Sequence, residues 1–245
     1  MRPLQLPPVA PEYERMIERA VAQTLTHGEP AGDAVHCAIV VAKGEGRDLE
    51  RLAAALRRHA SRPLHLWVLA RPGSGALERR LRGTTSSRLP IRGLARVSRL
   101  VLADLLPGVD RVVALAPAAV ADADVAVLER LDLGGSSFAA PLKPGASGFG
   151  VIHRAAARLR DRTQAASELR RTAHARHRFD FDAFGGDVMV LDLARMRRDG
   201  FGSRALPLVQ EFDLRDLEVL HYLAGPDRAT IPAREAAAFT PREDG

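Results

Sequence analysis

The stretch VDRVVALAPAA, residues 109–119, decides the fold that this chain is expected to adopt. Residues 109–115 form a short apolar run, which is typical of a strand buried on both faces inside a parallel sheet. In open α/β sheets, ligands bind beyond the carboxyl ends of the strands. The side chains that follow Leu115 would therefore face a ligand, yet Ala116, Pro117 and Ala118 carry only methyl groups and a proline ring.

The flanking sequence has the alternation of strands and helices that builds such a sheet. Apolar strands are expected at residues 35–42 and 64–70, with an amphipathic helix at 48–59 between them. This βαβ unit predicts a largely parallel sheet. Further helices are expected at residues 75–81, 94–106, 125–131, 151–177, 192–198, 203–211 and 214–223, and further strands at 89–91, 137–140 and 187–191.

The length and composition fit one α/β domain with an extension at each end. The 245 residues are 46% hydrophobic and 27% charged, and they are enough to bury a substantial core. We expect a Pro-rich tail and accessory helix in residues 1–32, a main domain in 33–235 and a loose tail in 236–245. The accessory helix, at 12–26, is expected to cap the domain, and self-association is the alternative.

Three segments of the chain resemble signatures of glycosyltransferase family 8. Residues 97–107 resemble that family's R-L-x-L-x-x-x-L-P. Residues 109–135 resemble the strand that ends in D-x-D in the family and the d-L-g-g that comes after it. Residues 184–197, FGGDVMVLDLARMR, resemble F-N-a-G-v-l-v-l-n-L-x-x-w-R, and residues 216–221, DLEVLH, resemble D-Q-x-v-L-N. The resemblance covers about residues 33–235. It implies a GT-A fold, the nucleotide-diphospho-sugar transferase-like α/β arrangement, in which a mostly parallel sheet is flanked by helices. The N-terminal helix is extra to it.

The chain departs from the family at the positions that the resemblance assigns to chemistry. The two acids of the D-x-D fall on Ala116 and Ala118, and the asparagine that faces the donor sugar falls on Gly185. Leu217 replaces the amide of the third signature, and His221 replaces its asparagine. The family's late metal-binding histidine has no counterpart. A family-type Mn²⁺ or Mg²⁺ site is therefore not expected, and no cofactor is expected.

Three residues of the family's site are retained as candidates for ligand binding. Arg99 matches the family arginine that faces the donor, and a guanidinium suits a phosphate or carboxylate. Its alternative role is an ion pair with Asp104 or Asp110. Asp216 and Glu218 match the third signature, and their alternative role is a solvated helix start.

Other polar groups have simpler interpretations. The DAD sequence at residues 122–124 is a D-x-D by pattern, but it precedes a helical run and is expected to cap that helix. His174, His177, Asp180 and Asp182 are expected to form a polar junction between a loop and a helix, because zinc needs more convergent ligands. The turn after the first strand is expected to be an ordinary one, although residue 43 is a lysine where the family has acids.

Charge and cysteine content limit the binding partners and the cellular compartment that the sequence predicts. The formal net charge is +6, and Lys43 and Lys143 are the only lysines among the 36 Lys and Arg residues. The arginines are spread along the chain among acids, which disfavours nucleic-acid binding. A lone cysteine, Cys37, fits a reducing cytoplasm. No apolar run is long enough to cross a bilayer, and residues 1–11 do not predict a secretory signal.

These observations favour one functional hypothesis over two others. The first is a family 8-like domain that is catalytically degenerate and acts as a binding or partner-stabilising subunit in glycan or surface-polymer synthesis. Its partners would be a nucleotide-sugar or glycan ligand, a protein, or a second copy of the chain. The second hypothesis is an active, metal-independent glycosyltransferase that uses a nucleotide-sugar donor. The third is an arginine-mediated polyanion binder.

Overall fold

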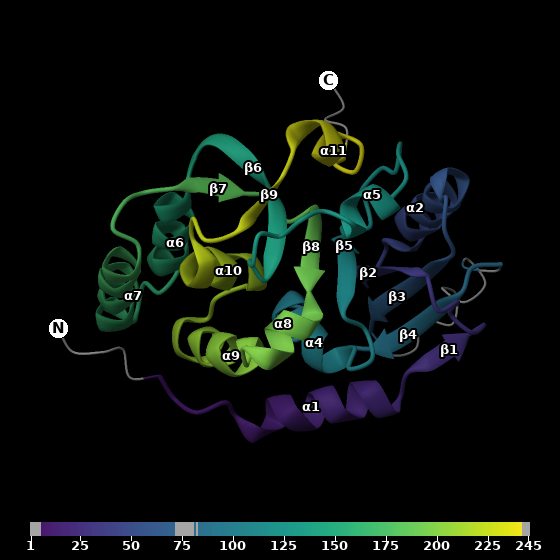
Figure 1. The fold of residues 1–245 in the computed structure, drawn as a ribbon. Helices are drawn as coiled ribbons and strands as arrows, with labels where there is room; N and C mark the ends of the chain where they lie inside the picture. The colour runs from purple at the N-terminus through teal and green to yellow at the C-terminus, as the bar shows by residue number, and fades with distance from the viewer. Residues whose placement is uncertain (1–5, 72–80, 82, 242–245) are drawn as a thin grey trace.

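The computed structural model describes residues 6–71, 81 and 83–241 of the chain. They form a central sheet with helices on both faces (Figure 1). The helix expected at residues 75–81 falls almost entirely outside the described residues.

The strands of the described residues form one mixed sheet. Its order is β1-β4-β3-β2-β5-β8-β6-β7, with β9 beside β6. The bounds are β1 Leu25–His27, β2 Val35–Val41, β3 Leu64–Ala70, β4 Ser86–Pro90, β5 Arg111–Leu115, β6 Phe138–Ser147, β7 Asp182–Phe184, β8 Val188–Asp192 and β9 Ala229–Ile231. The run β4-β3-β2-β5 is parallel, as the βαβ pattern predicts. The edge pair β1–β4 is antiparallel, and from β8 onward antiparallel pairing dominates, with β6–β9 as a parallel pair.

Two apolar cores hold the helices against the sheet. The helices are α1 Pro11–Ala22, α2 Gly46–His59, α4 Leu102–Leu105, α5 Ala126–Glu129, α6 Gly148–Ala157, α7 Thr163–Arg176, α8 Leu193–Arg198, α9 Phe201–Phe212, α10 Asp216–Ala224, α11 Ala233–Ala237 and the 3₁₀ turn η1 Ser98–Leu100. Residues of α2, α5 and α11 share one core with the sheet. Residues of α1, α4 and α6 to α10 share the other. The parallel strands, buried on both faces, are continuous apolar runs for this reason.

The strand β5 lies in the interior of the sheet, as its sequence predicts. It pairs with β2 on one side and β8 on the other. Val112 and Val113 are fully buried, one in each core. Cys37 of β2 is a buried free thiol, which confirms that it is a core residue.

The N-terminal helix ends earlier than expected, and a strand follows it. The expected helix at 12–26 ends at Ala22, because the next residues form β1 and pair antiparallel with β4. The hydroxyls of Thr26 and Ser87 lie 2.8 Å apart in this pairing. Ala20 is buried in the core, and Ala10 N donates to Gln210 Oε1 at 3.1 Å. β1 therefore extends the sheet at its β4 edge, and α1 packs beside α4 and β4 (Figure 1).

Four other expectations are corrected by the structure. The helix expected at residues 94–106 consists of turns, η1 and the single turn α4. The Pro/Gly segment after residue 140 continues β6, and the helical stretch at 151–177 is two helices, α6 and α7. The tail is not loose from residue 236: α11 extends into it, and Phe239 is buried against the core. Apolar packing of one aromatic ring holds this segment.

Among the described residues, no helix has both the length and the apolar character that a membrane crossing requires.

Candidate functional site

The residues directly after β5 have no side-chain atom that could bind a metal at the carboxyl end of this strand. Ala116 N donates to Asp187 O at 2.8 Å, which joins this turn to the residues before β8. Ala119 N donates to Ala116 O at 3.0 Å and closes the turn, with Ala118 exposed. The two positions that correspond to the family's acids are therefore methyl groups at an accessible edge.

The DAD sequence at residues 122–124 serves the helix that follows it. Asp124 Oδ1 accepts a hydrogen bond from Ala126 N at 3.0 Å, and Asp124 Oδ2 accepts one from the Ser61 hydroxyl. Burial raises the pKa of Asp124, but the hydrogen bonds from Ser61 and Ala126 outweigh it and hold that pKa below its ordinary value. Asp124 thus bonds the first residue of α5, as expected of this sequence, although the N-cap position itself is Val125.

Arg99 and Asp216, two of the three candidate residues, contact each other. Arg99 Nη1 donates to Asp216 Oδ2 at 2.9 Å, and Arg99 Nη2 donates to the carbonyl of Gly186 at 2.8 Å. The two side chains are 20% and 14% exposed. The alternative role that we expected for Arg99 thus exists, but the partner is Asp216, and not Asp104 or Asp110. The two charges neutralise each other.

The course of the chain explains this choice of partner. Asp216 N donates to Arg96 O at 3.0 Å, which places the start of α10 against the residues before η1. Asp110 pairs instead with Arg197 Nη2 at 2.9 Å. A sequence separation of more than 100 residues hides the Arg99–Asp216 pair from any local pattern.

Glu218, the third candidate, is held in an ion pair of its own. Glu218 Oε2 accepts from Arg158 Nη2 at 2.6 Å and from Arg215 N at 2.9 Å. Its side chain is 13% exposed, and the hydrogen bond that it accepts from Arg158 raises the pKa of Arg158. A solvated helix start is therefore wrong for Asp216 and Glu218, because both carboxylates are largely buried and paired.

Gly185, which stands where the resemblance places the family's donor-facing asparagine, and the adjacent Gly186 are closely flanked by side chains. A β-carbon on Gly186 would lie 3.5 Å from Leu217 Cδ1 and 3.7 Å from Arg99 Cζ. A β-carbon on Gly185 would lie 3.4 Å from Lys143 Cε. Leu217, which stands where the family has an amide, thus packs against Gly186. The Lys143 side chain lies against Gly185.

His221 is a buried, neutral member of this site. Its Nε2 accepts from Phe184 N at 3.1 Å, and its Nδ1 lies 2.7 Å from Leu217 O, to which it donates. The imidazole stacks on the Phe184 ring with a centroid distance of 3.7 Å, and the Arg228 guanidinium lies 4.8 Å from the centroid of the same ring. Burial lowers the pKa of His221 to about 4, although the hydrogen bond to Leu217 opposes this change.

The histidine and aspartate cluster does not converge. His177 Nε2 lies 2.9 Å from Tyr222 O, and His174 contacts His153 with an Nε2 to Nε2 distance of 3.2 Å. Asp180 accepts from the backbone N of Phe149 at 3.0 Å. In the part of the chain that the structure describes, no three His, Cys, Asp or Glu side chains are grouped as metal ligands.

The turn after β2 is an ordinary one, as expected. Ala42 N donates to Glu45 Oε2 at 2.6 Å, and Glu45 N donates to Ala42 O at 3.4 Å. Gly44 has φ 100°, which glycine adopts without strain.

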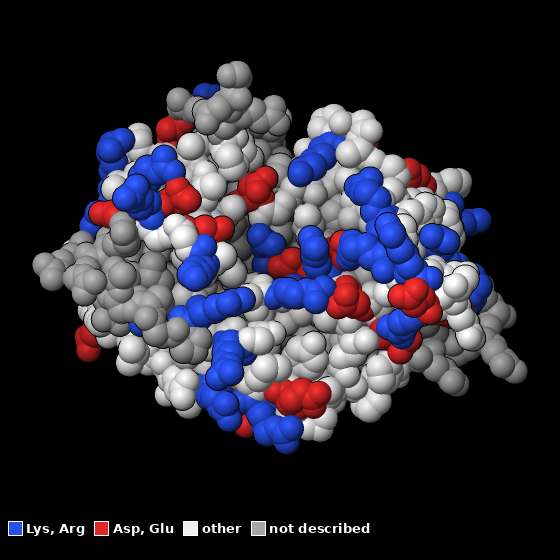
Figure 2. All heavy atoms as spheres, turned by 180° about the vertical axis from the view of Figure 1, so that it is seen from behind, with Lys and Arg blue, Asp and Glu red and all other residues white. Residues whose placement is uncertain are grey.

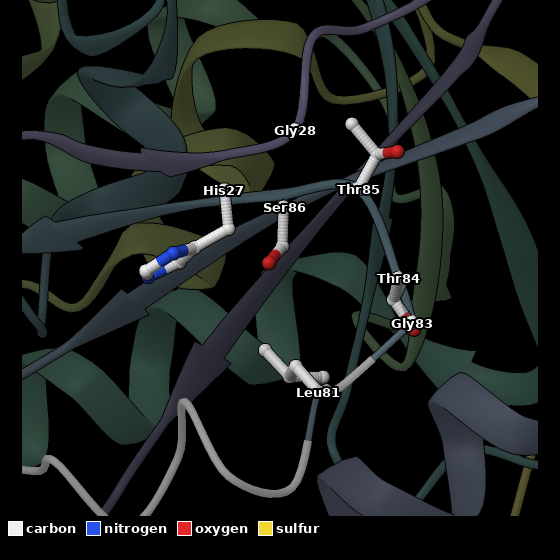
Figure 3. A pocket seen from close by; sticks show the side chains of 7 residues that line it. All are labelled: His27, Gly28, Leu81, Gly83, Thr84, Thr85 and Ser86. Atoms are coloured by element: carbon white, nitrogen blue, oxygen red, sulfur yellow. The ribbon is translucent and has the colours of Figure 1, made fainter.

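A separate hollow lies near the other end of the sheet. It has a volume of about 380 Å³ and is lined by His27, Gly28, Leu81, Gly83, Thr84, Thr85 and Ser86 (Figure 3). Thr84 Oγ1 is buried there without a hydrogen-bond partner. The hollow is open and adjoins β1 and β4, so it is distinct from the group around Arg99.

Positive charge is visible on one face of the molecule. Lys and Arg side chains form a band across the middle of the face shown in Figure 2, with Asp and Glu side chains among them. This mixture agrees with the interleaved charges of the sequence.

Sequence reasoning missed Lys143, Phe184 and Arg228, which lie beside the candidate residues. Phe184 and Arg228 meet only through the folding of β7 against the residues before β9. For Lys143 a signal was present, because it is one of the two lysines in an arginine-rich chain.

Comparisons with known proteins show the fold. No protein-family model matches the chain, and no curated protein matches its sequence. Similar solved structures include the bifunctional glycosyltransferase WbbM, with 16% identity and a TM-score of 0.63 over 84% of this chain and 40% of that one. GlyE of Streptococcus pneumoniae TIGR4 gives 15% identity and a TM-score of 0.60 over 81% and 45%. The galactosyltransferase LgtC, in complex with donor and acceptor sugar analogs, gives 14% and 0.60 over 82% and 74%.

This chain spans less than half the length of WbbM and GlyE. At these identities the similarity concerns the arrangement of the backbone. The chain has the fold of the GT-A-type glycosyltransferases.

Proposed function

We propose that this chain is a degenerate, family 8-like glycosyltransferase domain that acts as a binding or partner-stabilising subunit in glycan or surface-polymer synthesis. In this proposal it needs no metal cofactor and does not catalyse metal-dependent sugar transfer. The lone, buried thiol of Cys37 suits the reducing cytoplasm, where we place this subunit.

One observation carries the proposal: the groups that would meet a donor contact each other. Arg99 is neutralised by Asp216, and Leu217 packs on Gly186. His221 is neutral, buried and hydrogen-bonded on both ring nitrogens. A site that catalyses by electrostatic stabilisation instead aims its charges and donors at the reacting group.

The strand end supports the same proposal. A departing nucleoside diphosphate needs positive charge, which family members supply through a metal held by carboxylates. Ala116 and Ala118 have no side-chain oxygen to offer, and Asp124 is committed to Ala126 and Ser61.

Calorimetric titration tests the proposal. The purified chain is titrated with uridine, guanosine and cytidine diphosphate sugars, with and without Mn²⁺, and sugar transfer is assayed in parallel. We expect no Mn²⁺-dependent binding and no transfer. Transfer from any nucleotide-sugar that EDTA abolishes would refute the proposal.

Metal-independent transfer is the second candidate, and one observation favours it. The Arg99 guanidinium lies at the glycine turn before β8, where its charge would be close to a donor phosphate if Asp216 released it. This candidate predicts transfer that is insensitive to EDTA and is lost in Arg99→Ala. Our proposal predicts no transfer in either protein.

A further inference from the structure

Lys143 places an unneutralised positive charge beside the glycine turn of the candidate site. It follows Leu142, which is paired with Phe184, so β6 carries it alongside the residues before Gly185. Its Cε lies 3.4 Å from the place of a β-carbon on Gly185, and Lys143 is exposed. The same place lies 3.3 Å from Pro141 Cγ, so Pro141 and the Lys143 side chain flank the buried Gly185, and Lys143 itself reaches the surface beside the turn.

The other cations of this site are already engaged. Arg99 donates to Asp216 and Gly186, as described above. Arg228 donates to the carbonyls of Gly225 at 2.9 Å and Asp182 at 3.2 Å while it lies over the Phe184 ring. Within the described ranges, Lys143 has no ion-pair or hydrogen-bond partner, so it is the cation of this site that is free to bind an anion.

The carboxylates of Asp216 and Glu218 are paired with arginines and do not compensate Lys143. The positive charges of Arg228 and Lys143 both act on His221, which is neutral and lends no negative charge. The nearby carboxylate of Glu218 is committed to Arg158. An ammonium group in this setting favours an anion over a neutral ligand, because a charge-assisted hydrogen bond is about twice as strong as a neutral one.

We propose that Lys143 binds the negative group of an acidic saccharide, a carboxylate or a phosphate, at the Gly185–Gly186 turn. The saccharide part of this inference rests on the proposed function, and the acidic part rests on Lys143. The site would thereby select charged glycans over neutral ones without any metal.

Matched ligands and matched variants test this inference. The probes are trigalacturonate and its neutral methyl ester for the carboxylate, and glucose 6-phosphate and glucose for the phosphate. Lys143→Met removes the cation. Arg15→Met makes the same change in net charge on an exposed residue of α1, at a distance from the turn.

By calorimetry we expect the acidic member of at least one pair to bind the unmodified chain more tightly than its neutral counterpart. Lys143→Met should lower the affinity for that acidic probe about tenfold, which corresponds to the loss of one charge-assisted hydrogen bond. The affinity for the neutral counterpart should not change. Arg15→Met should leave the affinity of both within twofold. The pair that shows the effect identifies the anionic group.

A second measurement needs no variant. Because Lys43 and Lys143 are the only lysines, amine acylation followed by mass spectrometry reports on each of them. The acidic probe should slow acylation of Lys143, and its neutral counterpart should not.

Three outcomes would overturn the inference: no binding of either acidic probe, equal affinity for acidic and neutral probes, or equal losses in Lys143→Met and Arg15→Met. The last outcome would assign the binding to the general charge of +6. None of these outcomes depends on the EDTA-sensitive transfer that would refute the proposed function, so the two failures are distinguishable.

Discussion

The ion pair between Arg99 and Asp216 distinguishes a structural role from a ligand-binding role for both residues. If the pair is structural, Arg99→Met leaves a largely buried carboxylate and the Gly186 carbonyl without their donor. We expect Arg99→Met and Asp216→Asn each to lower the free energy of unfolding by about 1–3 kcal/mol. Urea denaturation of the two variants and of the double variant measures the coupling between them.

The exposed pair Arg96–Asp213 provides a matched control in the same region. Its side chains are 57% and 66% exposed, and its charged atoms are 3.1 Å apart. Arg96→Met should change the unfolding free energy by less than about 1 kcal/mol, as exposed pairs do. If Arg99→Met were as stable as the wild-type protein and lost ligand binding or transfer, the metal-independent enzyme would be the better hypothesis.

The buried histidines predict how stability depends on pH. Burial lowers the pKa of His221 to about 4 and that of His65 to about 4, with the nearby His36 adding to the second change. The unfolded chain, with ordinary histidines near 6.5, binds protons first as the pH falls. Their contribution to stability is therefore complete above about pH 6.5 and is lost as the pH falls toward about 4.

His221→Gln should flatten this pH dependence. It removes the contribution of His221, which is at most about 3 kcal/mol between pH 6.5 and pH 4. Denaturation curves at a series of pH values measure the slope, with His59→Gln on the exposed end of α2 as the control. An unchanged slope in His221→Gln would show that this imidazole is protonated or exposed in the folded protein.

At the scale of helices and strands, the sequence was most informative where burial is regular. The strands β2, β3, β5 and β8 and the helix α2 lie within a few residues of their expected bounds, because period and apolar content both mark them. Asp192 begins the segment expected as a helix at 192–198 and caps α8, since its Oδ1 accepts from Arg195 N at 2.7 Å.

The elements that the sequence did not indicate are short or exposed. All three residues of β1 are exposed, so no alternation marks it, and its pairing with β4 is a tertiary contact. The second half of β6 is largely exposed and pairs irregularly with β7, which a Pro/Gly sequence does not predict. Most apolar residues of the segment 94–106 are buried, although the segment does not form one helix.

The N-terminal helix α1 offers a test of its role as a cap. Ala20 is 1% exposed in the core, while Ala22 of the same helix is exposed. Ala20→Gln forces a large polar side chain into packed surroundings and should cost about 2–3 kcal/mol of unfolding free energy. Ala22→Gln should cost less than about 0.5 kcal/mol. Equal midpoints in urea for both variants would mean that α1 does not pack on the domain.

Over the whole molecule, packing couples the departures from the family pattern. Leu217 contacts Gly186 and accepts a hydrogen bond from His221, which in turn accepts one from Phe184 N. The sequence shows at which positions the chain departs from the family pattern that it resembles, because each departure stands in a motif. It did not predict that the residues present would satisfy one another, since those contacts join η1, β7 and α10 across the fold.

Restoring two acids at the strand end tests whether the frame still suits a metal. Ala116 is partly exposed and Ala118 is exposed, so the double variant Ala116→Asp, Ala118→Asp should fold. Two carboxylates one residue apart can hold a hard divalent cation weakly. We expect this variant to gain Mn²⁺ binding that the wild-type chain lacks, measured as loss of the free Mn²⁺ signal in electron paramagnetic resonance.

The same experiment distinguishes Mn²⁺ binding at the strand end from Mn²⁺ binding at the DAD sequence of residues 122–124. Asp124→Asn keeps an oxygen for the hydrogen bond from Ala126 N and should not alter Mn²⁺ binding in either background. The acid-restored variant should still transfer no sugar, because Gly185, Leu217 and His221 remain as they are. If the wild-type chain bound Mn²⁺ as well as the variant does, a metal site would exist elsewhere in the protein, and the loss of metal dependence that we propose would be wrong.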